Sequence, residues 1–156
     1  MELLKVQLDM ALGEKLFEES GSVTGFRVTK VHPIEGVTTE VSFTSEIRGI
    51  GRFPSGKNLG SGTVTQYPHG IVDGSYQGSF MITAEGGSSS SNNDYFVWWA
   101  HEKTKMVEGG KFKGLTMMTG FTHSQKLSWM NNLIIALDLE TDPPSQKFKA
   151  TAYEWK

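Results

Sequence analysis

Hydrophobic and polar residues alternate along much of this chain with the period of two that is typical of β-strands. The alternation is clearest between residues 37 and 48, where one face carries Val37, Thr39, Val41, Phe43, Ser45 and Ile47. The opposite face of this segment carries threonine, serine, glutamate and arginine, so we expect a half-buried strand. Residues 23–31 also have strand character, and the turn-forming Pro33 and Gly36 between the two segments predict an antiparallel hairpin.

Six more segments have strand character, namely residues 61–67, 71–84, 95–105, 112–121, 127–139 and 148–155. Short stretches rich in glycine, proline, serine and asparagine separate most of them and are typical of turns. These turns leave no room for crossover helices, and a long antiparallel meander usually closes on itself to protect its edges. The sequence therefore predicts one all-β domain over residues 1–156, a small antiparallel closed β-barrel of about eight strands.

Glycines and aromatic residues share one face of the segment 71–84. Gly74 and Gly78 alternate with Tyr76 and Phe80 on that face. Glycine in a strand interior usually marks strong coiling or a close approach of a neighbouring group, as a small barrel requires.

Two segments do not fit the strand pattern. In residues 1–20, leucines recur every four positions as on a helix face, while the first of them also alternate as in a strand. A short N-terminal helix and an extra edge strand are therefore both open for this segment. Residues 85–93 are almost entirely glycine, serine and asparagine, which bury too little apolar surface to become ordered, so we expect a flexible hairpin loop.

The segment 127–139 is apolar on both faces. One face carries leucine, isoleucine and Trp129, while the other still carries Met130, Ile134 and Ala136. The outer wall of a free barrel should be polar, so this pattern predicts a strand that is covered on both sides. The cover would be either the N-terminal segment or a neighbouring subunit, and we expect a homo-oligomer.

Composition excludes several classes of function. The 156 residues include no cysteine, which excludes disulfides and thiolate chemistry. The formal charge of −2, with both signs interspersed, provides no broad cationic surface for nucleic acid. No apolar stretch approaches the roughly 18 residues of a membrane helix, and the start of the chain does not resemble a signal peptide. We therefore expect a cytoplasmic protein that binds neither nucleic acid nor membranes.

The segment Trp98–Glu102 is the most suggestive for chemistry, because a histidine and a glutamate follow an aromatic stretch. Alternation puts Trp99 and His101 on one face and Trp98 and Glu102 on the other, so one of His101 and Glu102 should face inward. The inward group could act as a general acid or base, with its pKa shifted by burial. The alternative is a hydrogen-bonded structural side chain at the end of the strand.

Other positions are candidates for ligand binding. Asn131 interrupts an apolar segment, where a buried amide either orients a ligand or satisfies nearby backbone at a bulge. Alternation lets one of Tyr76 and Gln77 face the interior. We expect the ligand-binding set to include Trp99, Trp129, Asn131, Tyr76 and Gln77, together with His101.

No motif points to a metal or a cofactor. The histidines lack the spacing of a metal site; they are His32, His69, His101 and His123. The glycine pairs near residues 50 and 61 precede no expected helix, so they do not form a phosphate-binding loop, and no nucleophile elbow is present. We expect no metal and no cofactor.

Several short motifs resemble those of the uncharacterised DUF3224 proteins, which look like members of the allene-oxide-cyclase-like barrel group. The resemblance spans residues 21–84 and rests on Gly25-Phe26-Arg27-Val28, Gly49-Ile50-Gly51 and Tyr76-Gln77-Gly78-Ser79-Phe80. It implies an eight-stranded, often oligomeric barrel with an apolar lumen. The group includes cyclases and other isomerases that act mainly by shaping a bound hydrophobic substrate.

Three functions follow as hypotheses. The first is a barrel that binds an apolar or amphipathic small molecule in its lumen, since alternating apolar residues with a few inward polar groups are typical of ligand pockets. The second is a cofactor-independent isomerase or cyclase that uses the same cavity, with His101 or Glu102 as acid or base. The third is a structural or oligomerisation module built on the segment 127–139.

Overall fold

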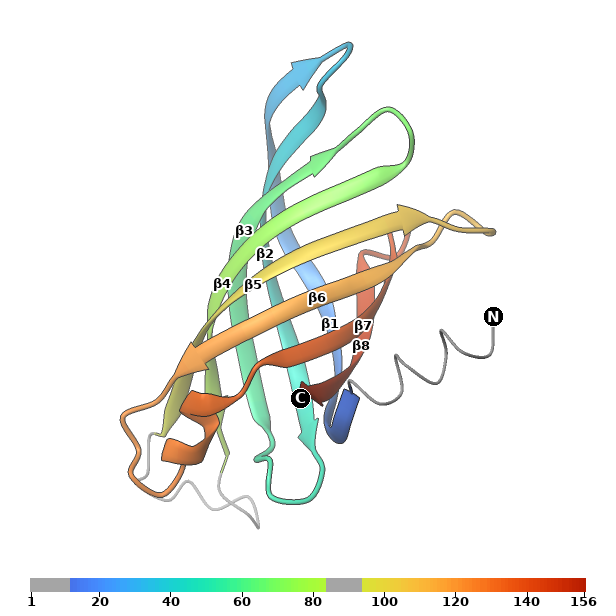
Figure 1. Cartoon of the computed structure of the whole chain (residues 1–156). Helices are drawn as coiled ribbons and strands as arrows, with labels where there is room; N and C mark the ends of the chain where they lie inside the picture. Colours follow the sequence, from blue (N-terminus) through green and yellow to red (C-terminus); the bar gives the residue numbers. More distant parts are fainter. Residues whose placement is uncertain (1–11, 84–93) are drawn as a thin grey trace, which may run out of the picture.

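The computed structural model describes residues 12–83 and 94–156, which form one antiparallel sheet closed into a barrel (Figure 1). Each strand pairs with the next in the sequence, and β1 pairs with β8 to close the sheet. This confirms the all-β closed barrel that the alternation predicts. The strands are β1 Leu12–His32, β2 Gly36–Gly49, β3 Gly56–Gln66, β4 Ile71–Ile82, β5 Tyr95–Met106, β6 Phe112–Phe121, β7 Ile135–Asp142 and β8 Lys147–Trp155.

The first strand is longer than the alternation predicts. It runs for 21 residues from Leu12, so the second half of the ambiguous segment 1–20 is strand. The pairing of β1 with β2 shifts register after Val23 and after Val28, and such bulges let a long strand bend around a barrel. Residues 1–11 and the loop expected at 85–93 lie outside the described residues.

The segment 127–139 corrects the sequence prediction of one continuous strand. Residues Ser128–Asn132 form a short 3-10 helix, η2, and β7 begins only at Ile135. Met130 is fully buried, and Leu127 and Leu133 on either side of the helix are almost as inaccessible. The segment is therefore apolar on both faces because it packs within the molecule's own core.

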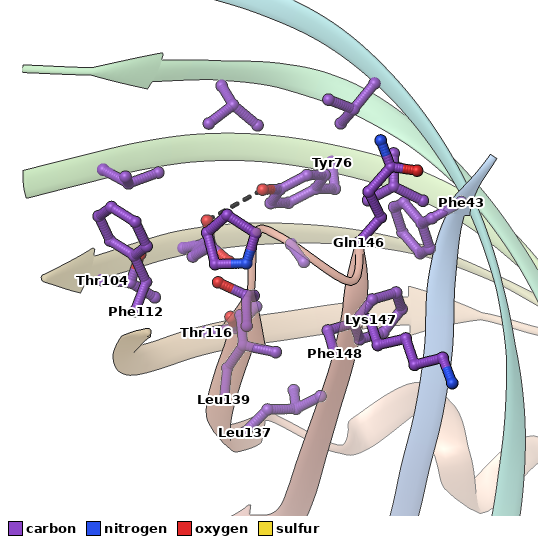
Figure 2. A pocket seen from close by; sticks show the side chains of 18 of the residues that line it. Phe43, Tyr76, Thr104, Phe112, Thr116, Leu137, Leu139, Gln146, Lys147 and Phe148 are labelled. Atoms are coloured by element: carbon purple, nitrogen blue, oxygen red, sulfur yellow. Dashed lines mark hydrogen bonds between the residues drawn. The ribbon is translucent and has the colours of Figure 1, made fainter. Parts of the chain in front are cut away.

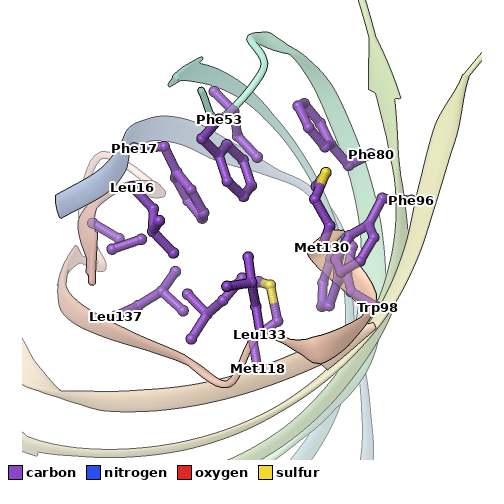
Figure 3. Close-up of a cluster of buried hydrophobic side chains, with 14 of the residues drawn as sticks. Leu16, Phe17, Phe53, Phe80, Phe96, Trp98, Met118, Met130, Leu133 and Leu137 are labelled. Carbon is purple, nitrogen blue, oxygen red and sulfur yellow. The ribbon is translucent and has the colours of Figure 1, made fainter. Parts of the chain in front are cut away.

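The hydrophobic core fills the end of the barrel that this segment closes, and Figure 3 shows side chains from many strands converging there. The rings of Phe17 and Phe53 lie 4.8 Å apart, and Phe53 stacks on Phe80 at 6.1 Å. Around them pack Leu16, Phe96, Trp98, Met118, Met130, Leu133 and Leu137. One end of the barrel is thus filled by side chains, and the candidate functional site lies towards the other end.

Inward aromatic rings lie on glycines of neighbouring strands, as the pattern in β4 predicts. A Cβ atom added to Gly60 would lie 2.3 Å from the ring of Phe43, and one added to Gly78 would lie 2.3 Å from the ring of Trp98. Real Cβ atoms do not approach a ring so closely, so these strands need glycine where the rings lie flat against the wall. The rings consequently occupy the wall of the barrel and leave its axis less filled.

Shortening the side chain at the centre of η2 should destabilise the whole barrel. We expect Met130→Ala to lower the free energy of unfolding by about 2–4 kcal/mol, because a fully buried side chain leaves a cavity when it is removed. Ile134→Ala is the matched control, since Ile134 is 45% exposed and should cost less than about 1 kcal/mol. Urea unfolding followed by circular dichroism measures both, and equal effects would contradict the role assigned to η2.

Candidate functional site

A cavity of about 490 Å³ occupies the lumen above the solid core. It reaches the end of the barrel at which the β7–β8 turn lies, and Figure 2 shows side chains from several strands around it. Most of its wall is apolar or aromatic. Residues lining it include Val23, Phe26, Val41, Phe43, Val64, Val72, Tyr76, Trp98, Ala100, Glu102, Thr104, Phe112, Thr116, Met118, Leu137, Leu139 and Phe148.

The register of β5 decides which side chains of the Trp98–Glu102 segment reach this cavity. Trp98 and Glu102 are buried and line the lumen, at 3% and 4% exposure. Trp99 is 54% exposed, and His101 lies with it on the outer face of the barrel. Of the two candidate acid or base residues, the inward one is therefore Glu102.

Tyr76 and Glu102 form a hydrogen-bonded pair inside the lumen. The Tyr76 hydroxyl donates to Oε2 of Glu102 over 2.9 Å. The tyrosine ring can lie along the sheet because Gly62 and Gly74 lack side chains, and a Cβ atom on Gly74 would lie 2.7 Å from the hydroxyl oxygen. Gly74 also pairs directly with Glu102 across the strands, so the missing side chain opens the space in which the two groups meet.

Burial shifts the ionisation of both groups. Desolvation raises the pKa of Glu102 to about 6, and the nearby Asp73 carboxylate adds to this, while the hydrogen bond from Tyr76 and the charge of His101 oppose it. Desolvation and the adjacent Glu102 raise the pKa of Tyr76 above its ordinary value. At neutral pH the pair therefore holds a mostly ionised carboxylate beside a protonated phenol.

Thr116 adds an unsatisfied polar atom next to this pair. It lies directly opposite Glu102 in the pairing of β5 with β6, and both side chains line the cavity. The residue is 6% exposed, and its Oγ1 is the one buried side-chain oxygen or nitrogen among the described residues without a hydrogen-bond partner. Buried hydroxyls are usually satisfied, so an orphan beside a carboxylate is consistent with a place for a ligand group.

A second polar network lies at the base of the lumen. The indole nitrogen of Trp98 donates to Oδ1 of Asn58 over 2.7 Å, and Nδ2 of Asn58 donates to Glu19 over 3.1 Å. The hydroxyl of Ser45 donates to the same glutamate oxygen over 2.5 Å. Burial raises the pKa of Glu19, and these donors act against that shift. The network fixes the orientation of Trp98, which forms part of the cavity wall.

Three predicted site residues lie on the outer face of the barrel, namely Gln77, Trp99 and His101. Gln77 is exposed and pairs across the strands with Trp99. His101 lies 3.1 Å from Asp73 through Nε2 and 3.2 Å from the Ser75 hydroxyl through Nδ1. These are the residue types of a hydrolytic triad, but they lie on the outside of the sheet and do not line the lumen cavity.

The other two predicted binding residues belong to η2. Trp129 packs against Phe53, and the guanidinium of Arg52 lies 4.0 Å from the centre of its ring. The amide of Asn131 exchanges two hydrogen bonds with the backbone of Thr122, accepting over 2.7 Å and donating over 3.1 Å. Neither residue lines the cavity, and Asn131 takes the backbone-satisfying alternative.

Three polar residues of the cavity were not predicted from the sequence, namely Glu19, Asn58 and Thr116. Glu19 lies in the segment left open between helix and strand, and Asn58 lies in a stretch that reads as a turn. Thr116 could have been found, because alternation in the segment 112–121 places it on the same face as Met118. What brings all three to one lumen is the closure of the sheet, which turns the inner faces of β1, β3 and β6 towards a common interior.

Two further features of the described residues bear on function. No group of three histidine, aspartate or glutamate side chains in residues 12–83 and 94–156 could hold a metal ion. In the same ranges, no helix is long and apolar enough to cross a membrane.

Comparisons with known proteins relate the chain to other barrels. No protein-family model and no curated protein matches it. A protein with unknown function from Clostridium acetobutylicum ATCC 824 has a TM-score of 0.74 at 16% identity, over 92% of this chain and 98% of that chain. A beta-barrel like protein from Acinetobacter baumannii AYE has a TM-score of 0.70 at 14% identity, over 93% and 95%. An enzyme from Penicillium herquei has a TM-score of 0.60 at 13% identity, over 90% and 92%.

At these identities the likeness concerns the fold. The chain shares a barrel-like architecture with proteins of unknown function, and the coverage shows that the whole barrel is shared rather than a part of it.

Replacing the lumen carboxyl should stabilise the protein in a pH-dependent way. The pKa of Glu102 rises from 4.5 to about 6 on folding. This rise lowers the free energy of unfolding by about 2 kcal/mol at pH values above both pKa values. The penalty is absent below about pH 4.5, where both states are protonated, and grows as the pH rises to about 6. We therefore expect Glu102→Gln to raise the free energy of unfolding by about 2 kcal/mol at pH 8 and by little at pH 4.

Chemical denaturation at the two pH values measures this difference. Glu46→Gln is the matched control, because Glu46 lies exposed on β2 and should show no comparable pH dependence. If Glu102→Gln raised the free energy of unfolding equally at pH 4 and pH 8, the raised pKa assigned to Glu102 would be contradicted.

Proposed function

We propose that this protein binds an apolar or amphipathic small molecule in the lumen of its barrel. The cavity of about 490 Å³ falls within the range of small-molecule sites, about 300–1,000 Å³. Its wall combines many apolar residues with a few convergent polar groups, which is the usual composition of a ligand pocket. The hydrogen-bonded pair of Tyr76 and Glu102 supplies the polar groups that would orient the ligand.

The observation that carries this proposal is that the barrel is hollow at one end. An eight-stranded barrel is wide enough either to be filled by its own side chains or to hold one small ligand, so the placement of the inward side chains decides which of the two occurs. Here Phe43 and Tyr76 lie against glycines in the wall, which keeps their rings out of the axis. In a barrel selected only for stability, side chains that filled this space would raise the free energy of unfolding.

The barrel-like neighbours support the architecture of this proposal without naming a ligand. Membership of the DUF3224 or allene-oxide-cyclase-like group stays a prediction from the motifs, and it agrees with a lumen that holds a hydrophobic molecule. A cytoplasmic location and a homo-oligomer also stay predictions. Several large apolar side chains are exposed on the outer face of β3 to β6 and are available for self-association, among them Leu59, Met81, Tyr95, Trp99 and Phe121.

Filling the lumen should abolish binding of an apolar probe. We expect the uncharged fluorophore N-phenyl-1-naphthylamine to bind with increased emission and to change the fluorescence of Trp98. Val64→Phe should weaken this binding at least tenfold, because position 64 lines the cavity opposite Gly74 and a larger ring would occupy it.

The matched control is Val97→Phe, which adds the same ring on the outer face of β5 and should leave binding unchanged. Trp99→Phe should leave the tryptophan response unchanged, and Trp98→Phe should remove it. Absence of probe binding, or equal effects of the two phenylalanine variants, would refute a lumen site.

The second candidate function is a cofactor-independent isomerase. The observation that favours it is Glu102, a cavity-lining carboxylate whose burial raises its pKa to about 6, close to the value suited to a general base. One structural neighbour is an enzyme, which is compatible with catalysis on this fold. In such a reaction Glu102 would take a proton next to a carbonyl group and return it at another carbon.

An enolisable apolar ketone tests this second function. If Glu102 acts as a base, 2-tetralone in D₂O should exchange its α-protons faster with the protein than with buffer. Nuclear magnetic resonance measures the rate, and Glu102→Gln should abolish the acceleration while N-phenyl-1-naphthylamine still binds. Exchange that persists in Glu102→Gln would assign the base elsewhere, and no exchange by the native protein would leave binding as the function.

A further inference from the structure

We infer that the lumen selects an apolar amine, with the ammonium group held between Glu102 and Thr116. This inference rests on the proposed function and names the ligand class for the same cavity.

The charges of the cavity favour a cation. Among the described residues that line it, the acids are Glu19, Glu102 and Asp142, and the one base is Lys147. Lys147 is the first residue of β8 and is exposed next to the β7–β8 turn, whereas Glu19 and Glu102 are buried. A carboxylate ligand in mid-lumen would face the Glu102 carboxylate without a buried cation to pair with, which costs binding energy.

The polar atoms left for a ligand match an ammonium group. Tyr76 donates to Oε2 of Glu102, and no other described side chain donates to this carboxylate, so Oε1 remains for a ligand donor. Thr116 lies directly across from Glu102, and its Oγ1 has no partner among the described residues. Directly opposed residues have Cβ atoms about 4.5–5.5 Å apart, so one ammonium with three N–H donors can reach both.

Aromatic rings complete the environment of a cation. Phe43 lies at the centre of a cluster, 5.8 Å from Tyr76, 6.0 Å from Trp98 and 5.5 Å from Phe148 between ring centres. All four rings line the same cavity as Glu102. Ring faces attract cations, and carboxylates combined with aromatic walls are suited to organic ammonium groups. The apolar body of the amine would contact the valines and leucines of the wall.

Three ligands with the same chain and different head groups test the inference. Decylamine, 1-decanol and decanoate are titrated below their aggregation limits at pH 7.5 against protein loaded with N-phenyl-1-naphthylamine, and displacement gives the affinity of each. We expect decylamine to bind at least tenfold more tightly than decanoate and 1-decanol. In Glu102→Gln the three affinities should agree within about threefold, because the pairing charge is gone.

Two further variants test whether the preference for decylamine depends on the groups of the proposed site or on charge elsewhere on the protein. Thr116→Val keeps the shape and removes the unpaired hydroxyl, so the fold should be retained while decylamine loses about fivefold in affinity and decanoate does not. Glu46→Gln removes an exposed charge of the outer face and should keep the full preference for decylamine.

The outcomes distinguish the two levels of the proposal. Displacement by all three ligands with equal affinity, or with decanoate the tightest, would overturn the amine inference and leave a lumen-binding protein. A preference for decylamine that survives in Glu102→Gln would overturn the placement of the ammonium group. A native protein that binds neither the fluorophore nor any of the three ligands would overturn the proposed function, and the inference with it.

Discussion

The contact of inward aromatic rings with glycine backbone decides whether this barrel is solid or hollow. Phe43 lies on Gly60, Tyr76 crosses Gly62 and Gly74, and each ring is kept against the wall. If these glycines carried side chains, the rings would have to turn into the axis and fill it. The lumen, its polar groups and every function considered above depend on that arrangement.

The two ends of the barrel have different roles: one holds the stabilising core and the other holds the candidate binding site. At one end η2 turns inward and completes a core in which Met130 and Phe17 are almost inaccessible. The other end contains the lumen cavity and the carboxylate of Glu102, whose burial costs free energy. A stable core at one end makes such a cost tolerable, because folding does not rely on packing in the lumen.

The lumen carboxylate is also what separates this cavity from a purely apolar one. Glu102 has one hydrogen-bond donor, Tyr76, and an unsatisfied hydroxyl opposite it in Thr116. Burying polar groups without partners costs free energy, and a ligand that supplies the missing partners offsets that cost. The same group supports binding and proton transfer, which is why the two candidate functions share one site.

Alternation and turn residues were enough to predict an all-β closed barrel of about eight strands, and glycines beside aromatics in β4 were enough to predict close packing there. They could not decide which face of β5 turns inward, because both faces carry a tryptophan and a polar residue, and a shift of one residue exchanges them. They also could not reveal η2, since an apolar stretch that enters the core has the same composition as a strand covered on both sides. The meetings of Glu19 with Asn58 and of Tyr76 with Glu102 join residues that lie 39 and 26 positions apart in sequence, and only the register and curvature of the folded sheet bring them together.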